Sequence, residues 1–149
     1  MSENTSENRY KNLIVSELKH EPEMSPEFRD IYQKFAKRIL WIDDHVVPGA
    51  FQMNTSWYKA VPERDPIFAE HAHESAEIIG FFGSDPENPN ELYGEVQVDL
   101  NGEAHIITKS SMIFIPPNLP HAIHIYRVDL PIFHFSAVTE GLYNGSAYN

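Results

Sequence analysis

From Ala50 onward, apolar and polar residues alternate in short runs that are separated by turn-forming residues. The clearest pair of runs is EVQVDL and EAHIIT, which flank Asn101-Gly102. An Asn-Gly pair between two alternating runs is the strongest local signal for a β-hairpin. Further runs of this kind are AFQMNTSWYKA, MIFI, AIHIYR and PIFHFSAV. The pattern predicts an all-β domain, built as a sandwich or as a small barrel.

A helical pattern precedes this β-rich part. Ser25 is a suitable N-cap, and Pro26 suits the first position of a helix. Apolar residues then recur at helical spacing as far as Ile39, which predicts a helix over about residues 26–38. Its apolar stripe must pack on the barrel or on a second subunit, and we expect a homodimer.

The same patterns divide the chain into four segments. They are a partly disordered arm (1–24), a helical segment (25–40), a barrel (41–140) and a C-terminal tail (141–149).

The strand over residues 51–58 has two different faces, and either of them can line the interior. One face is more polar and carries Gln52, Asn54, Ser56 and Tyr58; the other carries Phe51, Met53, Thr55 and Trp57. Because apolar faces usually pack inward, we expect the second face to point into the domain.

Composition and charge narrow the possible functions. The chain has 149 residues, which is the size of one domain, and it has no cysteine. Thiolate metal sites, iron–sulfur clusters and disulfides are therefore excluded. The formal net charge of -11 disfavours binding to nucleic acid or to an anionic membrane. The polar N-terminal stretch has no apolar signal segment, and no run approaches the roughly 20 apolar residues of a membrane span, so we expect a cytoplasmic protein.

The stretch HAHESAE, residues 71–77, carries the main candidate for chemistry. His71 and His73 would share one face of a strand, and a following corner would bring Glu77 back to the same point. Imidazole and carboxylate groups are good ligands for transition metals. Glu74 competes with Glu77 for this role, and two surface histidines are the simpler alternative. Farther along, His121 directly follows IFIPPNLP, a buried strand that runs into a turn restricted by prolines.

These two motifs in this order resemble those of the cupin superfamily. The first motif of that family is His-x-His, then three or four residues, then Glu, with a later Gly, here Gly80 or Gly83. The second reads Pro-x-Gly-x-x-His, and here Pro117 to His121 matches it with Asn118 in place of glycine. Asn tolerates the left-handed conformation that glycine adopts, so we expect the turn to survive. Ser110-Ser111 replaces the glycine that usually opens the second motif.

The resemblance covers about residues 50–138 and implies a double-stranded β-helix, or jelly-roll, barrel with one metal near its centre. Carried over residue by residue, the ligands are His71, His73, Glu77 and His121. The metal would be one divalent transition ion per chain: Fe, Mn, Ni, Zn or Cu. A standalone domain with all of these ligand types favours catalysis, so we expect a metal-dependent enzyme that acts on a small oxygenated organic molecule. The aromatic-rich, mainly apolar strands favour an aromatic substrate, and a keto acid is a further candidate.

The reaction class stays open at this point. The candidates are a dioxygenase, a Lewis-acid lyase or isomerase, and a hydrolase that activates water. A non-catalytic sensor of small ligands and a purely structural metal are the alternatives.

Other residues are candidates for helping in catalysis. His134, Tyr58 and Glu95 are candidates for acid–base roles, although a packed core histidine is the more frequent situation for a residue like His134. Candidates for substrate binding are Trp57, Tyr126 and Arg127, the last as a clamp for a carboxylate or as a partner of surface acids. His124 lies three residues beyond His121, so we expect it on the outer face of its strand.

Overall fold

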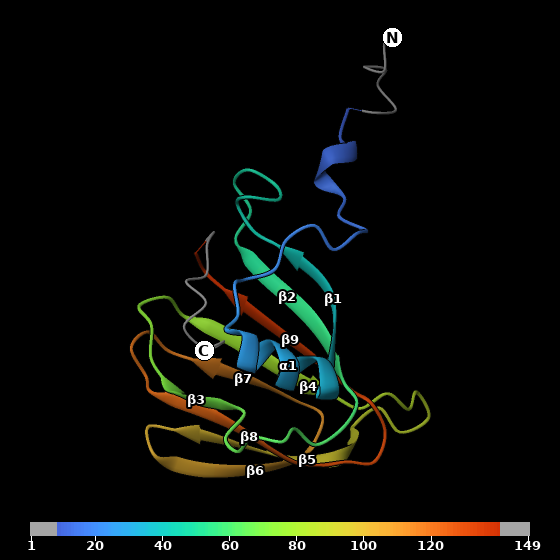
Figure 1. Cartoon of the computed structure of the whole chain (residues 1–149), viewed down its shortest axis with the longest axis vertical. Coiled ribbons are helices and arrows are strands. Elements are labelled where there is room, and N and C mark those ends of the chain that lie inside the picture. The colour runs from blue at the N-terminus through green and yellow to red at the C-terminus, as the bar shows by residue number, and fades with distance from the viewer. Residues whose placement is uncertain (1–8, 141–149) are drawn as a thin grey trace.

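A computed structural model describes residues 9–140 of the chain. In this range two antiparallel sheets face one another, with a short helix against them (Figure 1). The strands are β1 (Ala36–Ile42), β2 (Gln52–Tyr58), β3 (Phe68–His71), β4 (Glu77–Phe82), β5 (Glu91–Leu100), β6 (Glu103–Lys109), β7 (Ser111–Ile115), β8 (His121–Val128) and β9 (Ile132–Val138). The first sheet has the order β1-β2-β9-β4-β7, and the second has the order β3-β8-β5-β6. The all-β barrel with one N-terminal helix is therefore confirmed.

The predictions for the ends of the chain lie partly outside the described range, which omits residues 1–8 and 141–149. Among the described residues, the arm contains a single 3-10 turn, Lys11–Leu13, before the helix. No helix in the described part has the length and apolar character that a membrane crossing requires.

The helix α1 (Pro26–Phe35) begins as the sequence predicts and ends earlier than predicted. Ser25 is the N-cap, and its hydroxyl accepts a hydrogen bond from the backbone N–H of Phe28 at 3.1 Å. Ala36, however, is already extended and starts β1, which pairs with β2. Ala36 and Ile39 fit a helical stripe, but cross-strand pairing to β2 outweighs that local pattern. The predicted boundaries at 38 and 40 were therefore wrong.

The apolar stripe of α1 packs on its own barrel. Phe28, Tyr32 and Phe35 are buried in the same cluster as the side chains of the strands. The helix therefore gives no reason to expect a second subunit, and the homodimer stays a prediction.

The predicted turns have the expected backbone conformations. Asn101 and Gly102 have φ angles of 52° and 82°, which are the positive values that a two-residue hairpin of this type needs. Asn118 has a φ of 67°, so it replaces the glycine of the second motif in the left-handed conformation.

The inward face of β2 is the polar one, contrary to the prediction. Gln52, Asn54, Ser56 and Tyr58 alternate as fully buried residues, whereas Met53, Thr55 and Trp57 are only half-buried. The reason is a set of polar partners inside the barrel. Arg38 donates from Nη1 to Asn54 Oδ1 at 2.7 Å, and the hydroxyls of Tyr32 and Ser56 lie 2.7 Å apart.

Strand register extends this polar surface from β2 to β9. Asn54 pairs with Ser136, and Ser56 pairs with His134. On β4 the corresponding inward residues are Ile79 and Phe81. The interior thus has a polar half along β1, β2 and β9 and an apolar half that continues from β4 into the second sheet.

Candidate metal centre

Three histidines and one glutamate meet at one end of the barrel. His71 ends β3 and pairs directly with His121, which begins β8. Glu77 begins β4 after the short corner that follows His73. The backbone N–H of Asn118 donates to the carbonyl of His73 at 2.7 Å, so the two sequence motifs are joined by a hydrogen bond.

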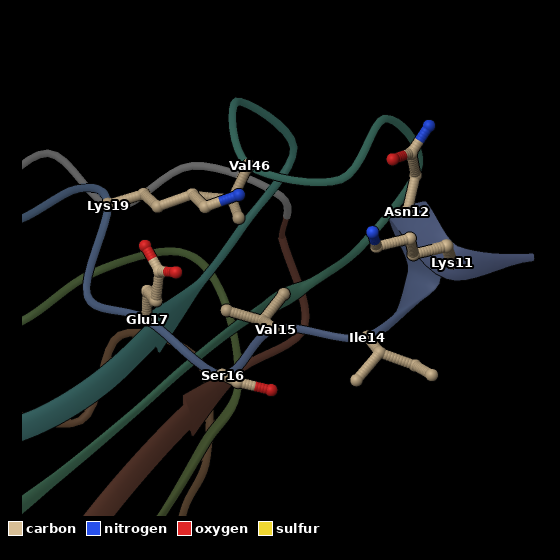
Figure 2. A pocket seen from close by; sticks show the side chains of 8 residues that line it. All are labelled: Lys11, Asn12, Ile14, Val15, Ser16, Glu17, Lys19 and Val46. Carbon is tan, nitrogen blue, oxygen red and sulfur yellow. The ribbon is translucent and has the colours of Figure 1, made fainter. Parts of the chain in front are cut away.

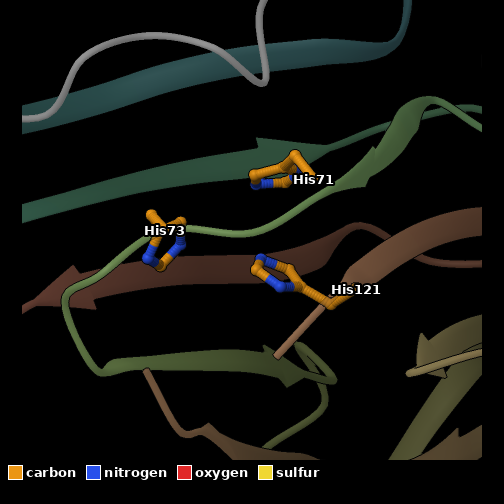
Figure 3. A group of neighbouring side chains, drawn as sticks. All are labelled: His71, His73 and His121. Carbon is orange, nitrogen blue, oxygen red and sulfur yellow. The ribbon is translucent and has the colours of Figure 1, made fainter. Parts of the chain in front are cut away.

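The histidine rings turn toward a common point, as Figure 3 shows. One ligand nitrogen from each of His71, His73 and His121 lies within 4.8 Å of the others. We call these three residues together with Glu77 the barrel cluster. Glu77 Oε1 lies 2.9 Å from His73 Nε2 and 3.4 Å from His121 Nε2. Glu77 therefore lies beside two of the three histidines, as a fourth potential ligand.

Each histidine of the barrel cluster is fixed by a backbone carbonyl at its other nitrogen. The Nδ1 atoms of His71, His73 and His121 lie 2.8–2.9 Å from the carbonyl oxygens of Ala69, Ser75 and Leu119, respectively. A carbonyl only accepts, so each Nδ1 carries the hydrogen and, in the neutral ring, each Nε2 keeps its lone pair. This is the orientation that histidine ligands of metal sites take.

Glu77 is buried and held in its ionised form. Burial opposes ionisation, but the hydroxyl of Ser136, together with His121 and His73, which donate from Nε2 when their rings are protonated, holds the pKa of Glu77 well below its ordinary value. Ser136 is an inward residue of β9 and donates its hydroxyl to Glu77 Oε2. In turn, the hydrogen bond to Glu77 raises the pKa of His73, whereas burial lowers the pKa of His71. A buried anion beside three imidazoles is a strong attraction for a divalent cation.

The donor set fits a first-row transition metal. Three imidazole nitrogens and one carboxylate suit Fe, Mn, Ni, Zn or Cu, and they suit Mg or Ca poorly. His71, His73, His121 and Glu77 would hold such an ion. The choice of Glu77 over Glu74 follows the geometry, because Glu77 is the carboxylate in contact with two of the histidines.

His134 and Tyr58 lie deeper in the same interior. His134 is 6% exposed, and its Nδ1 donates to the carbonyl of Gly80 at 2.9 Å. Its ring lies between Tyr58 and Phe81, with centroid distances of 4.9 and 4.8 Å. Burial lowers the pKa of His134 to about 4, so the ring is neutral at pH 7. This packing favours a core histidine, and an acid–base role for His134 or Tyr58 stays a prediction.

The structure does not bring the remaining candidates to the barrel cluster. Trp57 is on the outer face of β2, where its ring contacts Phe133. Tyr126 is 41% exposed, and Arg127 donates from Nε to Asp129 at 2.9 Å. Glu95 lies beside Arg127 at 3.7 Å. Arg127 is thus the partner of surface acids, which is the second of the two roles that the sequence left open.

His124 lies on the other face of β8 from His121, as expected. It bridges two acids, with Nδ1 2.5 Å from Asp65 and Nε2 2.8 Å from Asp99.

Sequence reasoning missed the polar residues that surround the site. Ser136 contacts Glu77, and Arg38 and Asn54 form the far side of the polar half. The alternation of polar residues in β2 was a usable signal for Asn54, but Arg38 was hidden in the supposed helix.

A second group of potential ligands lies outside the barrel interior. Ligand atoms of His20, Asp43 and His45 also lie within 4.8 Å of one another. We call these three residues the arm cluster, because His20 belongs to the N-terminal arm and the other two to the turn after β1.

The arm also borders a groove of about 460 Å³. Figure 2 shows the residues from Lys11 to Lys19 along one side of it and Val46 on the other. None of its lining residues belongs to the barrel cluster, so this groove is separate from the candidate metal centre.

No family model matches the sequence, and no curated protein matches it. The structure is similar to oxalate oxidase in complex with the substrate analogue glycolate, with a TM-score of 0.54 and 14% identity over 88% of this chain and 61% of that chain. Another oxalate oxidase structure gives a TM-score of 0.53 and 14% identity over 87% of this chain and 60% of that one. An RmlC-like cupin from Shewanella frigidimarina matches with a TM-score of 0.43 and 15% identity, over 69% of this chain and 73% of that chain.

Such low identities show the fold alone, and the chain spans about three fifths of the oxalate oxidase chain. The arrangement of two antiparallel sheets with the ligand residues at one end agrees with the resemblance found in the sequence. The chain thus has the fold of a cupin-type jelly-roll barrel.

Proposed function

We propose that this protein is a metal-dependent enzyme that acts on a small oxygenated organic molecule at the barrel cluster. The observation that carries the proposal is the set of three Nδ1 anchors on His71, His73 and His121, whose ring nitrogens come within 4.8 Å of one another. Orienting three rings in this way supports the binding of an ion.

A bound divalent metal supplies Lewis acidity toward a substrate oxygen, and a redox-active metal also supplies electrons for reactions with O₂. The protein's own contribution is to fix the ligands and to shape the space beside them. Ser136 holds Glu77 by its second carboxylate oxygen, so Oε1 stays directed at the histidines. We expect the apolar half of the interior to exclude water from one side of the site and the polar half to offer hydrogen bonds on the other.

The dioxygenase and the lyase or isomerase classes are both compatible with this arrangement. A Lewis-acid enzyme needs a group that moves a proton. His134 would be the candidate at its Nε2 atom, because its Nδ1 already donates to Gly80. An O₂-dependent enzyme does not need this group, so replacing His134 separates the two classes.

The test is elemental analysis of the protein purified without chelators, beside two variants. We expect about one metal per chain in the wild type, loss of that metal in His121→Ala, and retention in His45→Ala, which changes the arm cluster. Circular dichroism would check that both variants are folded. Iron would direct the next assays to O₂ uptake, whereas zinc, nickel or manganese would direct them to anaerobic lyase and isomerase assays.

Absence of metal from the wild type, with none taken up on reconstitution, would refute the enzyme proposal. A protein that binds metal and small acids but converts none of them would instead support the sensor alternative.

A further inference from the structure

The outward face of the first sheet is apolar almost throughout. Strand register places its outward side chains in three rows across the sheet. From β1 toward β7, the rows are Ile42, Met53, Ala137, Ile78 and Phe114; then Leu40, Thr55, Phe135, Gly80 and Met112; and then Lys37, Trp57, Phe133 and Phe82. Only Thr55 and Lys37 among them are polar, and Lys37 is at a corner. We call these residues the outer sheet face.

The second sheet has the ordinary pattern of a sheet with one side in water. On β5 the outward residues include Gln97 and Asp99, and Gln97 pairs with the outward His124 of β8. The residues that alternate with them on β5, Val96 and Val98, are buried. Antiparallel sheets that face water on one side alternate in this way. The outer sheet face departs from this pattern, and its composition is that of a surface that another layer covers.

Within residues 9–140, no such layer covers the outer sheet face on the side of β4 and β7. Met112 is 69% exposed, Phe114 is 60% exposed and Ile78 is 42% exposed. Phe51, which precedes β2, is 64% exposed. Phe51, Ile78 and Phe114 also line an apolar groove of about 300 Å³ at the end of the face where the first row lies. A contiguous apolar patch of this kind marks an interaction surface.

The centre of the face is flat because of Gly80. A Cβ atom at this position would collide with the ring of Phe135, so the ring lies against the glycine backbone. The same ring stacks on Phe82, with a centroid distance of 6.1 Å and an interplanar angle of 23°. A level surface of this kind lets a second sheet approach to the spacing of about 10 Å that packed sheets keep.

The charges of the chain favour a second copy as the partner. The chain has 22 acidic and 11 basic residues, and its net charge of -11 opposes association of copies through most surfaces. The three rows contain no acidic side chain, and their one basic side chain is Lys37. Two copies that meet through the outer sheet face therefore keep their carboxylates apart. The same net charge repels an anionic membrane, which is another surface that an apolar face could contact.

The size of the face suits a dimer. Five strands about 4.8 Å apart and seven residues long, at about 3.4 Å per residue, span roughly 19 by 23 Å, or about 440 Å² in projection. A standard interface buries about 800 Å² of accessible surface on each partner. Because side chains make the accessible surface larger than its projection, the face supplies more than half of that area, and Phe51 extends it. A two-fold axis between two copies makes this one surface complementary to itself.

We propose that the outer sheet face is a homodimer interface, in which the first sheets of two copies pack face to face around a two-fold axis. The inference goes beyond the proposed function and does not depend on it, because none of the histidines of the barrel cluster belongs to the first sheet. It places the second subunit on the sheet and not on α1.

The test is sedimentation equilibrium of the full chain over a range of concentrations. We expect the wild type to form a dimer at micromolar concentrations. Phe114→Lys and Met112→Lys each place a charge in the interface of both copies, so each should raise the dissociation constant by about a hundredfold or more. Both side chains are exposed in the single chain, so both variants should fold, which circular dichroism and thermal melting would check.

The matched control is Ile106→Lys. Ile106 is a 55% exposed apolar residue on β6 of the second sheet, so its replacement should leave the dissociation constant unchanged. A wild type that stays monomeric up to millimolar concentrations would overturn the inference, even if the protein bound vesicles of a neutral lipid through the same face. A dimer that persists in both Phe114→Lys and Met112→Lys would also overturn it. So would a dimer that Ile106→Lys weakens as much as they do, because it would form through another surface.

Discussion

The barrel cluster and the arm cluster each bring three potential metal ligands within 4.8 Å, yet they differ in how these ligands are held. In the barrel cluster every histidine donates from Nδ1 to a carbonyl, and Glu77 accepts from its neighbours. In the arm cluster no such anchor holds His20 or His45 within residues 9–140. Proximity of ligand atoms is therefore the weaker criterion, and orientation by neighbouring groups separates the two clusters.

The carboxylates of the two clusters also have different roles. Asp43 is 1% exposed and already accepts three hydrogen bonds, from the Trp41 indole at 2.8 Å and from the backbone N–H groups of His45 and Val46 at 2.9 and 3.2 Å. These bonds close the turn after β1. Glu77 instead accepts from side chains that are themselves candidate ligands. Asp43 thus serves the fold, whereas Glu77 is available to an ion.

The largest expected effect is on metal affinity. We compare the same kind of substitution, carboxylate to amide, in the two clusters. Glu77→Gln removes the negative charge at nearly constant shape, and we expect metal affinity to fall by more than about a hundredfold, since even groups behind the ligands contribute about 10- to 100-fold. Asp43→Asn should leave metal affinity unchanged. Competition with a chromophoric chelator would measure both, and equal losses would show that the arm cluster also binds the metal.

For the stability of the metal-free protein, we expect the arm cluster to matter through its carboxylate, Asp43. Asp43→Ala leaves the Trp41 indole and two backbone N–H groups without their acceptor in a buried turn. We expect the free energy of unfolding to fall by about 2 kcal/mol. Urea denaturation of chelator-treated protein would measure this. His45→Ala, which keeps the backbone bonds of the turn, is the control, and a similar loss in that variant would contradict the role given to the Asp43 carboxylate.

The features that were predicted correctly from the sequence are those that neighbouring residues determine. The hairpin at Asn101-Gly102, the cap at Ser25 and the left-handed turn at Asn118 follow from local residue preferences and were predicted correctly. The grouping of the histidines was inferred from the alternation of side chains along a strand and from the position of one proline-rich turn. For these features a single sequence contains the necessary information.

Two predictions about the fold were wrong, the end of the helix and the inward face of β2, and both errors have the same cause. Residues 36–38 lay within the predicted helix, so Arg38 was not recognised as an inward residue of a strand. Without Arg38 in the interior, the polar face of β2 had no partner, and the apolar face was the reasonable choice for the core. The pairing of β1 with β2 decides both features, and pairing between strands is set by tertiary contacts that the local pattern does not contain.

His134, in the barrel interior, extends the comparison to a histidine outside both clusters. The effect expected from its substitution is the smallest of those predicted here. His134 has an Nδ1 anchored to Gly80, as the barrel cluster has, but its ring lies between Tyr58 and Phe81. Among residues 9–140 no carboxylate forms a hydrogen bond with this ring. Anchoring thus serves core packing when the surroundings are aromatic. It serves a metal site only when several anchored rings converge beside an anion.

This difference has a consequence for stability in acid. Burial lowers the pKa of His134 to about 4, whereas a histidine in the unfolded chain has a pKa near 6.5. As the pH falls from about 6.5 toward 4, the unfolded chain binds a proton that the folded chain does not bind. The free energy of unfolding therefore falls, by up to about 1.4 kcal/mol per pH unit for this group. His134→Asn keeps a donor for Gly80 and cannot take up the proton, so its loss per pH unit should be smaller by about 1 kcal/mol. Urea titrations of both metal-free proteins at pH 7, 6 and 5 would measure the two slopes. Equal slopes would mean that His134 is protonated in the folded protein, and the ring would then be more accessible than its packing between two aromatic rings indicates.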